Sequence, residues 1–431
     1  MGVKMLSATR TTLNTLTIIS STLLSSLVIA DNLSYSSPES VGMSSEALER
    51  IAPLLQQYVD SGELVGVVSM VARHGEIVHF ENYGTLDMDT GAPIEKDSLF
   101  RIYSMSKPIT TVAAMMLYEE GKFQLSDPVS KFLPEFANLK VMGEGGSMVA
   151  PDRPMTMQML MSHTAGLSYG VFGDTVVDRQ YRDADILSNT DLAEMTSRLG
   201  EIPLQYQPGT RFHYSVSVDV LGRVVEVLSG QSLDAFFEQR IFTPLEMTDT
   251  FFEVPADKKP RFGTNHSFDP RTKTLAVSDR PETSAFANEV TFFSGGGGLV
   301  SSTEDYMRFS QMLLNGGELD GARILGRKTI EFMTQNHLPG IFGGPSLNTD
   351  ADLYGMSRGT GFGLGFAVVE DPAGAGGITS PGEFYWGGAA GTIFWIDPVE
   401  DLIGIVMVQH MNVQVPLRNT FKAVSYGALI E

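Results

Sequence analysis

The chain has 431 residues, of which 42% are hydrophobic, so it is long enough to bury a large core. Its 51 acidic and 30 basic residues give a net charge of −21, which argues against nucleic acid or an anionic membrane surface as a partner. The absence of cysteine excludes disulfides, thiol nucleophiles and cysteine-ligated metal ions.

The first 30 residues have the pattern of a secretory signal peptide. Lys4 and Arg10 lie at or before the start of an apolar, hydroxyl-rich stretch over 13–29, and no acidic residue occurs before Asp31. This stretch is too polar for a permanent transmembrane helix. We therefore predict that residues 1–30 are removed, and that the mature protein is secreted or periplasmic without stable membrane insertion.

The next segment combines a helix pattern with a hairpin pattern. Ser44 or Ser45 can cap a helix whose apolar residues recur at helical spacing. Strand-like runs follow at residues 65–73 and 76–80, and the His-Gly pair between them is typical of a tight turn. These patterns predict a helix packed beside a two-stranded hairpin at the start of an α/β region.

Ser104 and Lys107 form the only S-x-x-K motif in the chain. They open a segment with apolar residues at helical spacing, with Pro108 suited to its first turn and Gly121 to its end. The hydroxyl and the amine would then lie one turn apart, near backbone N–H groups that can stabilise an oxyanion. A neutral lysine could take the serine proton. The same pattern would also arise from a solvated serine and lysine that only cap a helix. Other motifs must therefore decide between a catalytic and a capping role.

Tyr214 belongs to a second motif, Tyr-Ser-Val. It follows a turn signal at 207–210 and precedes an apolar run at helical spacing, which predicts a position on a loop that enters a helix. The surrounding segment, 104–287, is rich in helix and loop patterns. Helices are predicted at 190–199 and 233–241, and surface loops at 142–155 and 253–280.

The C-terminal part returns to strand patterns. Its predicted elements are a helix over 301–315, strands over 362–369, 384–396 and 402–409, and a closing helix over 416–429. The sequence Trp386-Gly387-Gly388-Ala389 interrupts the second of these strands. Paired glycines inside a strand indicate a place where a ligand or another backbone approaches closely.

The order S-x-x-K, Y-S-x and W-x-G resembles that of serine esterases with the class C β-lactamase and D-Ala-D-Ala carboxypeptidase fold, the family VIII carboxylesterases. The resemblance extends from about Ser45 to the C-terminus, and further family-like stretches lie at 161–167, 206–209, 294–299, 361–366 and 386–392. It implies an α/β fold with an antiparallel sheet flanked by helices and a mostly helical domain. Residues 31–103 and 288–431 would form the α/β domain and residues 104–287 the helical domain, with the active site at their interface.

The resemblance also implies roles for the motif residues. Ser104 would be the nucleophile, Lys107 and Tyr214 would share the proton transfers, and the N–H groups of Ser104 and Ala389 would form the oxyanion hole. Residues that would line the substrate site are Trp386, Gly387, Gly388 and Ala389. No cofactor and no metal ion is predicted.

Two departures separate this chain from penicillin-recognising relatives. Val216 stands where they usually carry an asparagine, and Trp386 begins a motif where they carry Lys-Thr-Gly. This chain therefore lacks the amide that orients an acylamino group and the cation that attracts a substrate carboxylate in those relatives. We therefore expect a serine carboxylesterase that hydrolyses short-chain acyl esters through a covalent acyl-serine, with a small-molecule ester as its only predicted partner.

Two alternatives remain open from the sequence. One is a β-lactamase or a D-amino-acid peptidase or amidase on the same fold, and the other is a catalytically silent binding protein. None of the seven histidines has zinc-motif spacing, and residues 295–298, four glycines, lack the Lys-Ser/Thr of a phosphate loop. These glycines indicate a flexible or tightly packed turn. The oligomeric state is left open.

Overall fold

The computed structural model describes residues 1–2, 34–188, 190–338 and 358–431. The predicted signal peptide lies outside the described residues except for Met1 and Gly2, so its removal stays a prediction. Residues Leu33–Glu431 form one compact unit. Within the described part of the chain, no helix combines the length and the apolarity that crossing a bilayer requires.

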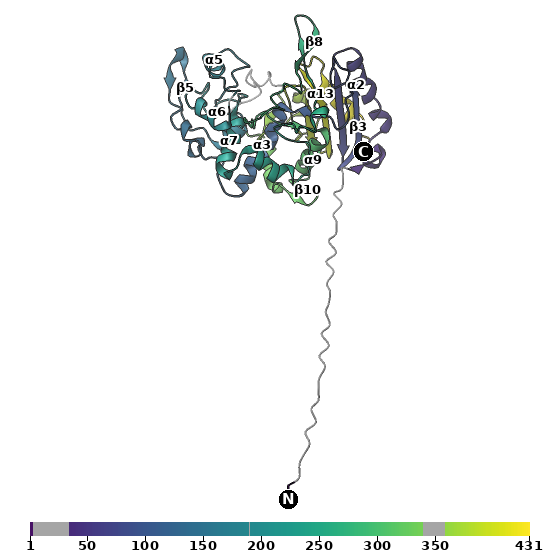
Figure 1. Cartoon of the computed structure of the whole chain (residues 1–431), viewed down its shortest axis with the longest axis horizontal. Helices are drawn as coiled ribbons and strands as arrows, with labels where there is room; N and C mark the ends of the chain where they lie inside the picture. Colours follow the sequence, from purple (N-terminus) through teal and green to yellow (C-terminus); the bar gives the residue numbers. More distant parts are fainter. Residues whose placement is uncertain (3–33, 189, 339–357) are drawn as a thin grey trace. The chain divides into compact units, whose positions relative to one another are not determined.

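An eight-stranded sheet forms the frame of this unit, in the order β1-β3-β2-β16-β15-β14-β13-β12 (Figure 1). Its strands are β1 Ser34–Tyr35, β2 Gly66–Arg73, β3 Glu76–Gly84, β12 Thr360–Phe362, β13 Ala367–Val369, β14 Phe384–Gly387, β15 Ile393–Asp397 and β16 Leu402–Val408. All neighbours are antiparallel except β1, which runs parallel to β3. The predicted antiparallel sheet flanked by helices is thus confirmed, with β1 as an addition.

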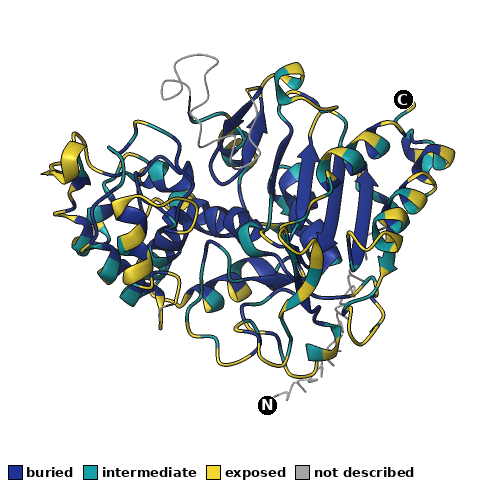
Figure 2. Cartoon of the chain, turned by 90° about the horizontal axis from the view of Figure 1, so that it is seen from above, coloured by how far each residue is buried: buried dark blue, intermediate teal, exposed yellow. Residues whose placement is uncertain are grey.

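Helices cover the sheet, and its central strands are buried (Figure 2). Every residue of β2 and of β16 is buried, as expected for strands with packed layers on both faces. The covering helices are α1 Ser45–Leu48, α2 Ile51–Asp60, α9 Thr303–Leu314 and α13 Leu417–Tyr426. Helix α9 packs against β2, β15 and β16, while α2 packs against β3 and α13 against β16.

A helical group lies beside this frame. It consists of α3 Ser106–Glu119, α4 Met157–Met161, α5 Val176–Asp183, α6 Leu192–Leu199, α7 Ser217–Ser229 and α8 Leu233–Phe237, with a π-helical turn at Glu238–Phe242. Helix α7 packs against α3, α4, α6 and α8. Helix α3 is buried from Ser106 to Leu117, because neighbours surround it on all sides.

Short elements complete the unit. They are β4 Phe100–Arg101, β5 Val141–Met142, β6 Met148–Val149, β7 Asn265–Asp269, β8 Thr274–Asp279, β9 Val300–Ser301, β10 Glu318–Leu319, β11 Ala322–Arg323, α10 Arg327–Met333, α12 Pro372–Ala375 and β17 His410–Met411. Among the described residues the 3₁₀ turns are η1 Pro38–Val41, η2 Tyr103–Met105, η3 Val129–Lys131, η4 Pro134–Phe136, η5 Glu144–Gly146 and η7 Lys259–Arg261. Strand β4 pairs with β9, and β7 pairs with both β8 and β17.

Some predicted segments are wrong in detail. The loop over 142–155 contains β6 and the end of β5, which pair as a short antiparallel hairpin. The strand over 384–396 is a hairpin of β14 and β15, and the strand over 362–369 is a hairpin of β12 and β13. In both, a glycine with positive φ reverses the chain, Gly391 at 82° and Gly365 at 90°. The loop over 253–280 contains the β7–β8 hairpin, which the sequence hides because β8 buries neither face fully. The division into residues 31–103 with 288–431 and residues 104–287 remains our proposal.

Candidate active site

Ser104 lies in η2, the single 3₁₀ turn that leads directly into α3. The preceding residue, Tyr103, has a φ of 41°, which is unfavourable for a residue with a side chain. Neighbouring elements hold this conformation. Asn265 Nδ2 donates to Tyr103 Oη at 3.1 Å, and Tyr306 Oη donates to the Met105 carbonyl at 3.0 Å. The turn that presents Ser104 is therefore strained and fixed from both sides.

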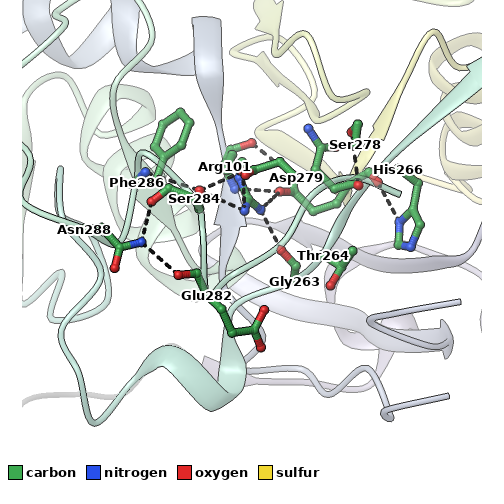
Figure 3. A network of polar contacts seen from close by, with 12 residues as sticks. Arg101, Gly263, Thr264, His266, Ser278, Asp279, Glu282, Ser284, Phe286 and Asn288 are labelled. Atoms are coloured by element: carbon green, nitrogen blue, oxygen red, sulfur yellow. Dashed lines mark hydrogen bonds and ion pairs between the residues drawn. The ribbon is translucent and has the colours of Figure 1, made fainter. Parts of the chain in front are cut away.

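A buried arginine anchors the strand before this turn (Figure 3). The side chain of Arg101 has no exposed surface and forms an ion pair with Asp279 at 2.6 Å. Its guanidinium also donates to the Gly263 carbonyl at 2.6 Å and to Ser284 Oγ at 3.1 Å. Because a buried charge is stable only when paired, the β7–β8 hairpin is tied to the strand that leads to Ser104.

Lys107 lies on the first turn of α3 and points back to Ser104. Its Nζ donates to Ser104 Oγ at 3.1 Å and to the Gly296 carbonyl at 2.5 Å. Burial lowers the pKa of Lys107 to about 7, although the Asp219 carboxylate opposes this effect. A large fraction of this amine is therefore neutral near pH 7 and able to accept a proton.

Tyr214 precedes α7 by three residues, which confirms its predicted place on a loop entering a helix. It shares a hydrogen bond with Ser104, and Trp386 Nε1 donates to its hydroxyl at 3.3 Å. Lys107 Nζ lies 4.7 Å from the centre of the tyrosine ring. Burial raises the pKa of Tyr214, so the hydroxyl keeps its proton at neutral pH and can act as an acid.

The predicted substrate segment is the end of β14 and the turn after it. Trp386 is the last buried residue of the strand, and its ring lies 5.4 Å from that of Tyr214. A Cβ on Gly388 would lie 2.4 Å from the Ile102 carbonyl oxygen, so only glycine fits against the segment before Ser104. Ala389 follows on the exposed part of the turn. The structure thus brings Gly388 to the turn that carries Ser104, while the oxyanion role of Ala389 stays a prediction.

A cavity of about 160 Å³ lies beside Tyr214. Its lining residues are Ser168, Tyr169, Phe172, Gly173, Thr175, Asp178, Gln205, Tyr206, His213 and Tyr214. Tyr169 and Phe172 contact the Tyr214 ring at centroid distances of 5.4 and 6.2 Å. No group of three acidic or histidine side chains among the described residues is placed to hold a metal ion.

Sequence reasoning missed two buried residues of the site. His163 lies 4.6 Å from the Tyr214 ring, and its Nδ1 accepts from the Ser215 N–H at 3.3 Å. Burial holds the pKa of His163 well below its usual value, so the imidazole is neutral. Asp219 on α7 is buried beside Lys107. An aspartate among the apolar residues Val218, Val220 and Leu221 was the sequence signal that could have identified it.

The chain also contains two G-x-S-x-G sequences, at 166–170 and 355–359, a spacing typical of the nucleophile turn of α/β-hydrolases. The serine of the second lies outside the described residues. Ser168 of the first donates its hydroxyl to the Asp178 carboxylate and follows no strand. The α/β-hydrolase nucleophile stands on a strand-to-helix turn, which Ser168 lacks. Its partner Asp178 also closes the capping box at the start of α5, so this motif has a structural explanation.

The bond from Trp386 to Tyr214 predicts a kinetic effect for Trp386→Phe. Loss of this donor leaves the tyrosine oxygen poorly oriented, so we expect kcat/KM for an ester to fall about tenfold, as for a lost hydrogen bond of roughly 1.4 kcal/mol. The chain has two tryptophans, and Trp395 Nε1 has no hydrogen-bond partner among the described residues, which makes Trp395→Phe the matched control. That variant should lower the melting temperature but keep kcat/KM. Equal kinetic losses in both variants would contradict the prediction.

Comparison with known proteins finds relatives that are named as esterases and hydrolases. The chain is 31% identical to Esterase EstB of Burkholderia gladioli, over 81% of this chain and 86% of that protein. It is 28% identical to Lovastatin esterase of Penicillium rubens, over 85% of this chain and 95% of that protein. The solved structure of EstCE1, a hydrolase with promiscuous acyltransferase activity, superposes with a TM-score of 0.76, at 27% identity, and covers 89% of this chain and 98% of that one.

The family model also matches nearly the whole of the compact unit. The model described as Beta-lactamase matches residues 51–426, which span the Ser104, Tyr214 and Trp386 motifs. Together with the esterase relatives, this match confirms the resemblance to family VIII carboxylesterases and the expected fold. The chain belongs to the Beta-lactamase family and is a serine hydrolase.

Proposed function

We propose that this protein is a serine carboxylesterase that hydrolyses short-chain acyl esters through an ester formed on Ser104. The observation that carries the proposal is the contact of 3.1 Å between Ser104 Oγ and Lys107 Nζ, an amine whose pKa is lowered to about 7. The names of the esterase relatives support ester hydrolysis as the reaction class.

In the acylation step, neutral Lys107 accepts the proton of the Ser104 hydroxyl while the serine oxygen attacks the ester carbonyl carbon. The N–H groups of Ser104 and Ala389 donate to the resulting oxyanion. When the tetrahedral intermediate collapses, the bond from the acyl carbon to the alcohol oxygen breaks. Tyr214 gives its hydroxyl proton to the departing alkoxide, and its phenolate takes a proton from the Lys107 ammonium.

In the deacylation step, a water molecule attacks the acyl carbon and gives a proton to the same pair of residues, Lys107 and Tyr214. The second tetrahedral intermediate then collapses, and the bond from the acyl carbon to the Ser104 oxygen breaks. The serine oxygen recovers its proton from the pair, and the acid is released. Each residue ends in its starting protonation state, so no cofactor is needed for the cycle.

The groups near Ser104 favour an uncharged ester over a β-lactam or a peptide. The Trp386 indole donates to Tyr214 and offers an apolar ring where a lactamase-like motif has a cation, and Val216 cannot hydrogen bond through its side chain. The net charge of −21 further disfavours an anionic substrate. Tyr169 and Phe172 line the compact cavity beside Tyr214, which supports a short acyl chain.

The test is kcat/KM for p-nitrophenyl acetate, butyrate and decanoate beside nitrocefin and a D-Ala-D-Ala peptide. We expect butyrate to exceed nitrocefin by about 10- to 150-fold, because one missing charged hydrogen bond is worth roughly 1.5–3 kcal/mol. Decanoate should react more slowly than butyrate. A higher value for nitrocefin or for the peptide would favour the alternative of a β-lactamase or peptidase, and no turnover with any of them would favour a silent binding protein.

A further inference from the structure

The four glycines at 295–298 form a tightly packed turn between α3 and α7. A Cβ on Gly295 would lie 2.9 Å from the Val218 carbonyl oxygen on α7 and 3.0 Å from Thr110 Cγ2 on α3. A Cβ on Gly296 would lie 2.3 Å from Asp219 Oδ2. Real Cβ atoms do not approach other atoms so closely, so the close approach of the two helices requires glycine here.

Hydrogen bonds tie this glycine turn to both helices. Asp219 Oδ1 accepts from the Gly296 N–H at 2.9 Å and also from the Ser294 hydroxyl. Thr110 Oγ1 donates to the Gly295 carbonyl at 2.7 Å. The Gly296 carbonyl in turn accepts from Lys107 Nζ at 2.5 Å. One peptide residue, Gly296, therefore links the Asp219 carboxylate to the Lys107 amine.

The charged and titratable groups around Lys107 come from three elements. Asp219 projects from α7, Tyr214 from the loop before α7, and His163 and Tyr169 from the segment after α4. Burial keeps His163 neutral and Tyr214 in its phenol form. Burial also raises the pKa of Asp219, but the Lys107 ammonium, the Ser294 hydroxyl and the Gly296 N–H oppose this effect because they stabilise its carboxylate. The Asp219 carboxylate in turn favours the ammonium form of Lys107, against the stronger opposite effect of burial.

We propose that Asp219 is a positioning residue that holds the glycine turn against Lys107 and sets the balance between its amine and ammonium forms. The geometry points to this role because the carboxylate is buried with its bonds directed at the turn rather than at solvent. The inference rests on the proposed function, in which Lys107 is the base for Ser104. It assigns to this reaction a residue that does not itself touch the ester.

Asp219→Asn separates charge from shape. The asparagine Oδ1 can still accept from Gly296 and Ser294, but the negative charge is lost, so the ammonium form of Lys107 loses its counter-charge. The pKa of Lys107 should fall, and the acid limb of the kcat/KM profile should move to lower pH by about one unit, the usual effect of a nearby opposite charge. A purely structural role would lower kcat/KM at every pH and leave the limb in place, which would overturn the proposal.

The matched control is Asp305→Asn. Asp305 is another buried aspartate, on α9, and burial raises its pKa to about 7, so it is the competing explanation for a limb near neutrality. Its carboxylate accepts from the Thr250 hydroxyl and the Asp249 N–H rather than from the glycine turn. In Asp305→Asn we expect the acid limb of the kcat/KM profile to fall at the same pH as in the wild-type protein. A limb that moves in this control and not in Asp219→Asn would overturn the assignment.

A second pair of variants tests the turn without changing any charge. Gly296→Ala must separate the turn from the Asp219 carboxylate, by moving one or the other, because its Cβ would be only 2.3 Å from Oδ2. In Gly297→Ala the nearest atoms lie 3.8 Å or farther, an ordinary contact distance, so this neighbour is the control. We expect kcat to fall at least tenfold more in Gly296→Ala than in Gly297→Ala, with both proteins folded by circular dichroism. Equal kcat values would refute the positioning role even if Asp219→Asn failed to fold.

The outcomes also distinguish this inference from the function on which it rests. If the wild-type protein hydrolyses no ester and forms no acyl-enzyme, the proposed function fails. If the wild-type protein is active, but the limb of Asp219→Asn stays in place and the two glycine variants have equal kcat, the proposed function stands and only the role of Asp219 is refuted.

Discussion

Ser104→Ala is expected to lower kcat/KM for p-nitrophenyl butyrate by about 10⁴- to 10⁶-fold, with the protein still folded. The reason is that in the proposed mechanism the serine oxygen forms the covalent bond to the acyl group. Among the described hydrogen bonds of Lys107 Nζ, the Ser104 hydroxyl is also the only hydroxyl partner. Rates of hydrolysis with purified protein, together with circular dichroism, measure both parts of the expectation. A folded variant with near-normal turnover would exclude Ser104 as the nucleophile.

Mass spectrometry after brief exposure to the ester locates the acyl group directly. The wild-type protein should gain one acyl mass, and a peptide map should place it on Ser104. Ser168→Ala is the matched control, since this serine lies in a G-x-S-x-G sequence but donates its hydroxyl to Asp178. That variant should still take the acyl label, whereas Ser104→Ala should not. Label on Ser168 in the wild-type protein would reverse the assignment.

The parts of the site that the sequence predicted are those that local pattern determines. Ser104 and Lys107 are three residues apart on one helix start, so their proximity follows from helix geometry alone. The position of Tyr214 on a loop before a helix was predicted from turn and helix signals. Its place in the same active site as Ser104 was predicted only from the family resemblance. No periodicity in the sequence relates these segments to each other.

The missed parts depend on contacts between distant segments. Trp386 and Tyr214 are 172 positions apart, and the bond between them exists only because the β14 end meets the loop before α7. Asp219 could not be paired with Lys107 for the same reason, since the glycine turn that links them comes from a third segment. The sequence thus predicted the helix that carries Asp219, but it did not indicate that Lys107 is its partner.

The misread fold elements have a local cause. The runs 362–369 and 384–396 are apolar on both sides of a reversal, so strand periodicity continues through the turn in the sequence. The left-handed glycines that reverse the chain were present, but glycine inside a strand also suits a close backbone approach. Gly388 is a site of close backbone approach, whereas Gly391 is the left-handed glycine that reverses the chain.

The arrangement of charges explains why the lysine and the tyrosine should work as one unit. Lys107 Nζ donates a hydrogen bond to Ser104 Oγ and lies 4.7 Å from the centre of the Tyr214 ring. Ser104 also shares a hydrogen bond with the tyrosine. Burial lowers the pKa of the amine and raises that of the phenol, so at neutral pH one accepts a proton and the other holds one. A proton that leaves Ser104 can thus pass between them within the same hydrogen-bonded group.

Lys107→Met should therefore lower kcat/KM by about 10³- to 10⁴-fold and Tyr214→Phe by about 10²- to 10³-fold, the usual range for general acid–base groups. The double variant should lose little more than Lys107→Met alone, because the tyrosine cannot relay a proton that the lysine no longer receives. As the control pair, Lys107→Met combined with Trp395→Phe should give a barrier increase equal to the sum of the two single variants, since the buried Trp395 makes no described hydrogen bond to the site. The measurement is kcat/KM for p-nitrophenyl butyrate in all variants at one pH near neutrality. A Lys107 and Tyr214 double variant whose barrier increase equals the sum of its singles would show that the two residues act independently, and the shared proton-transfer unit would have to be abandoned.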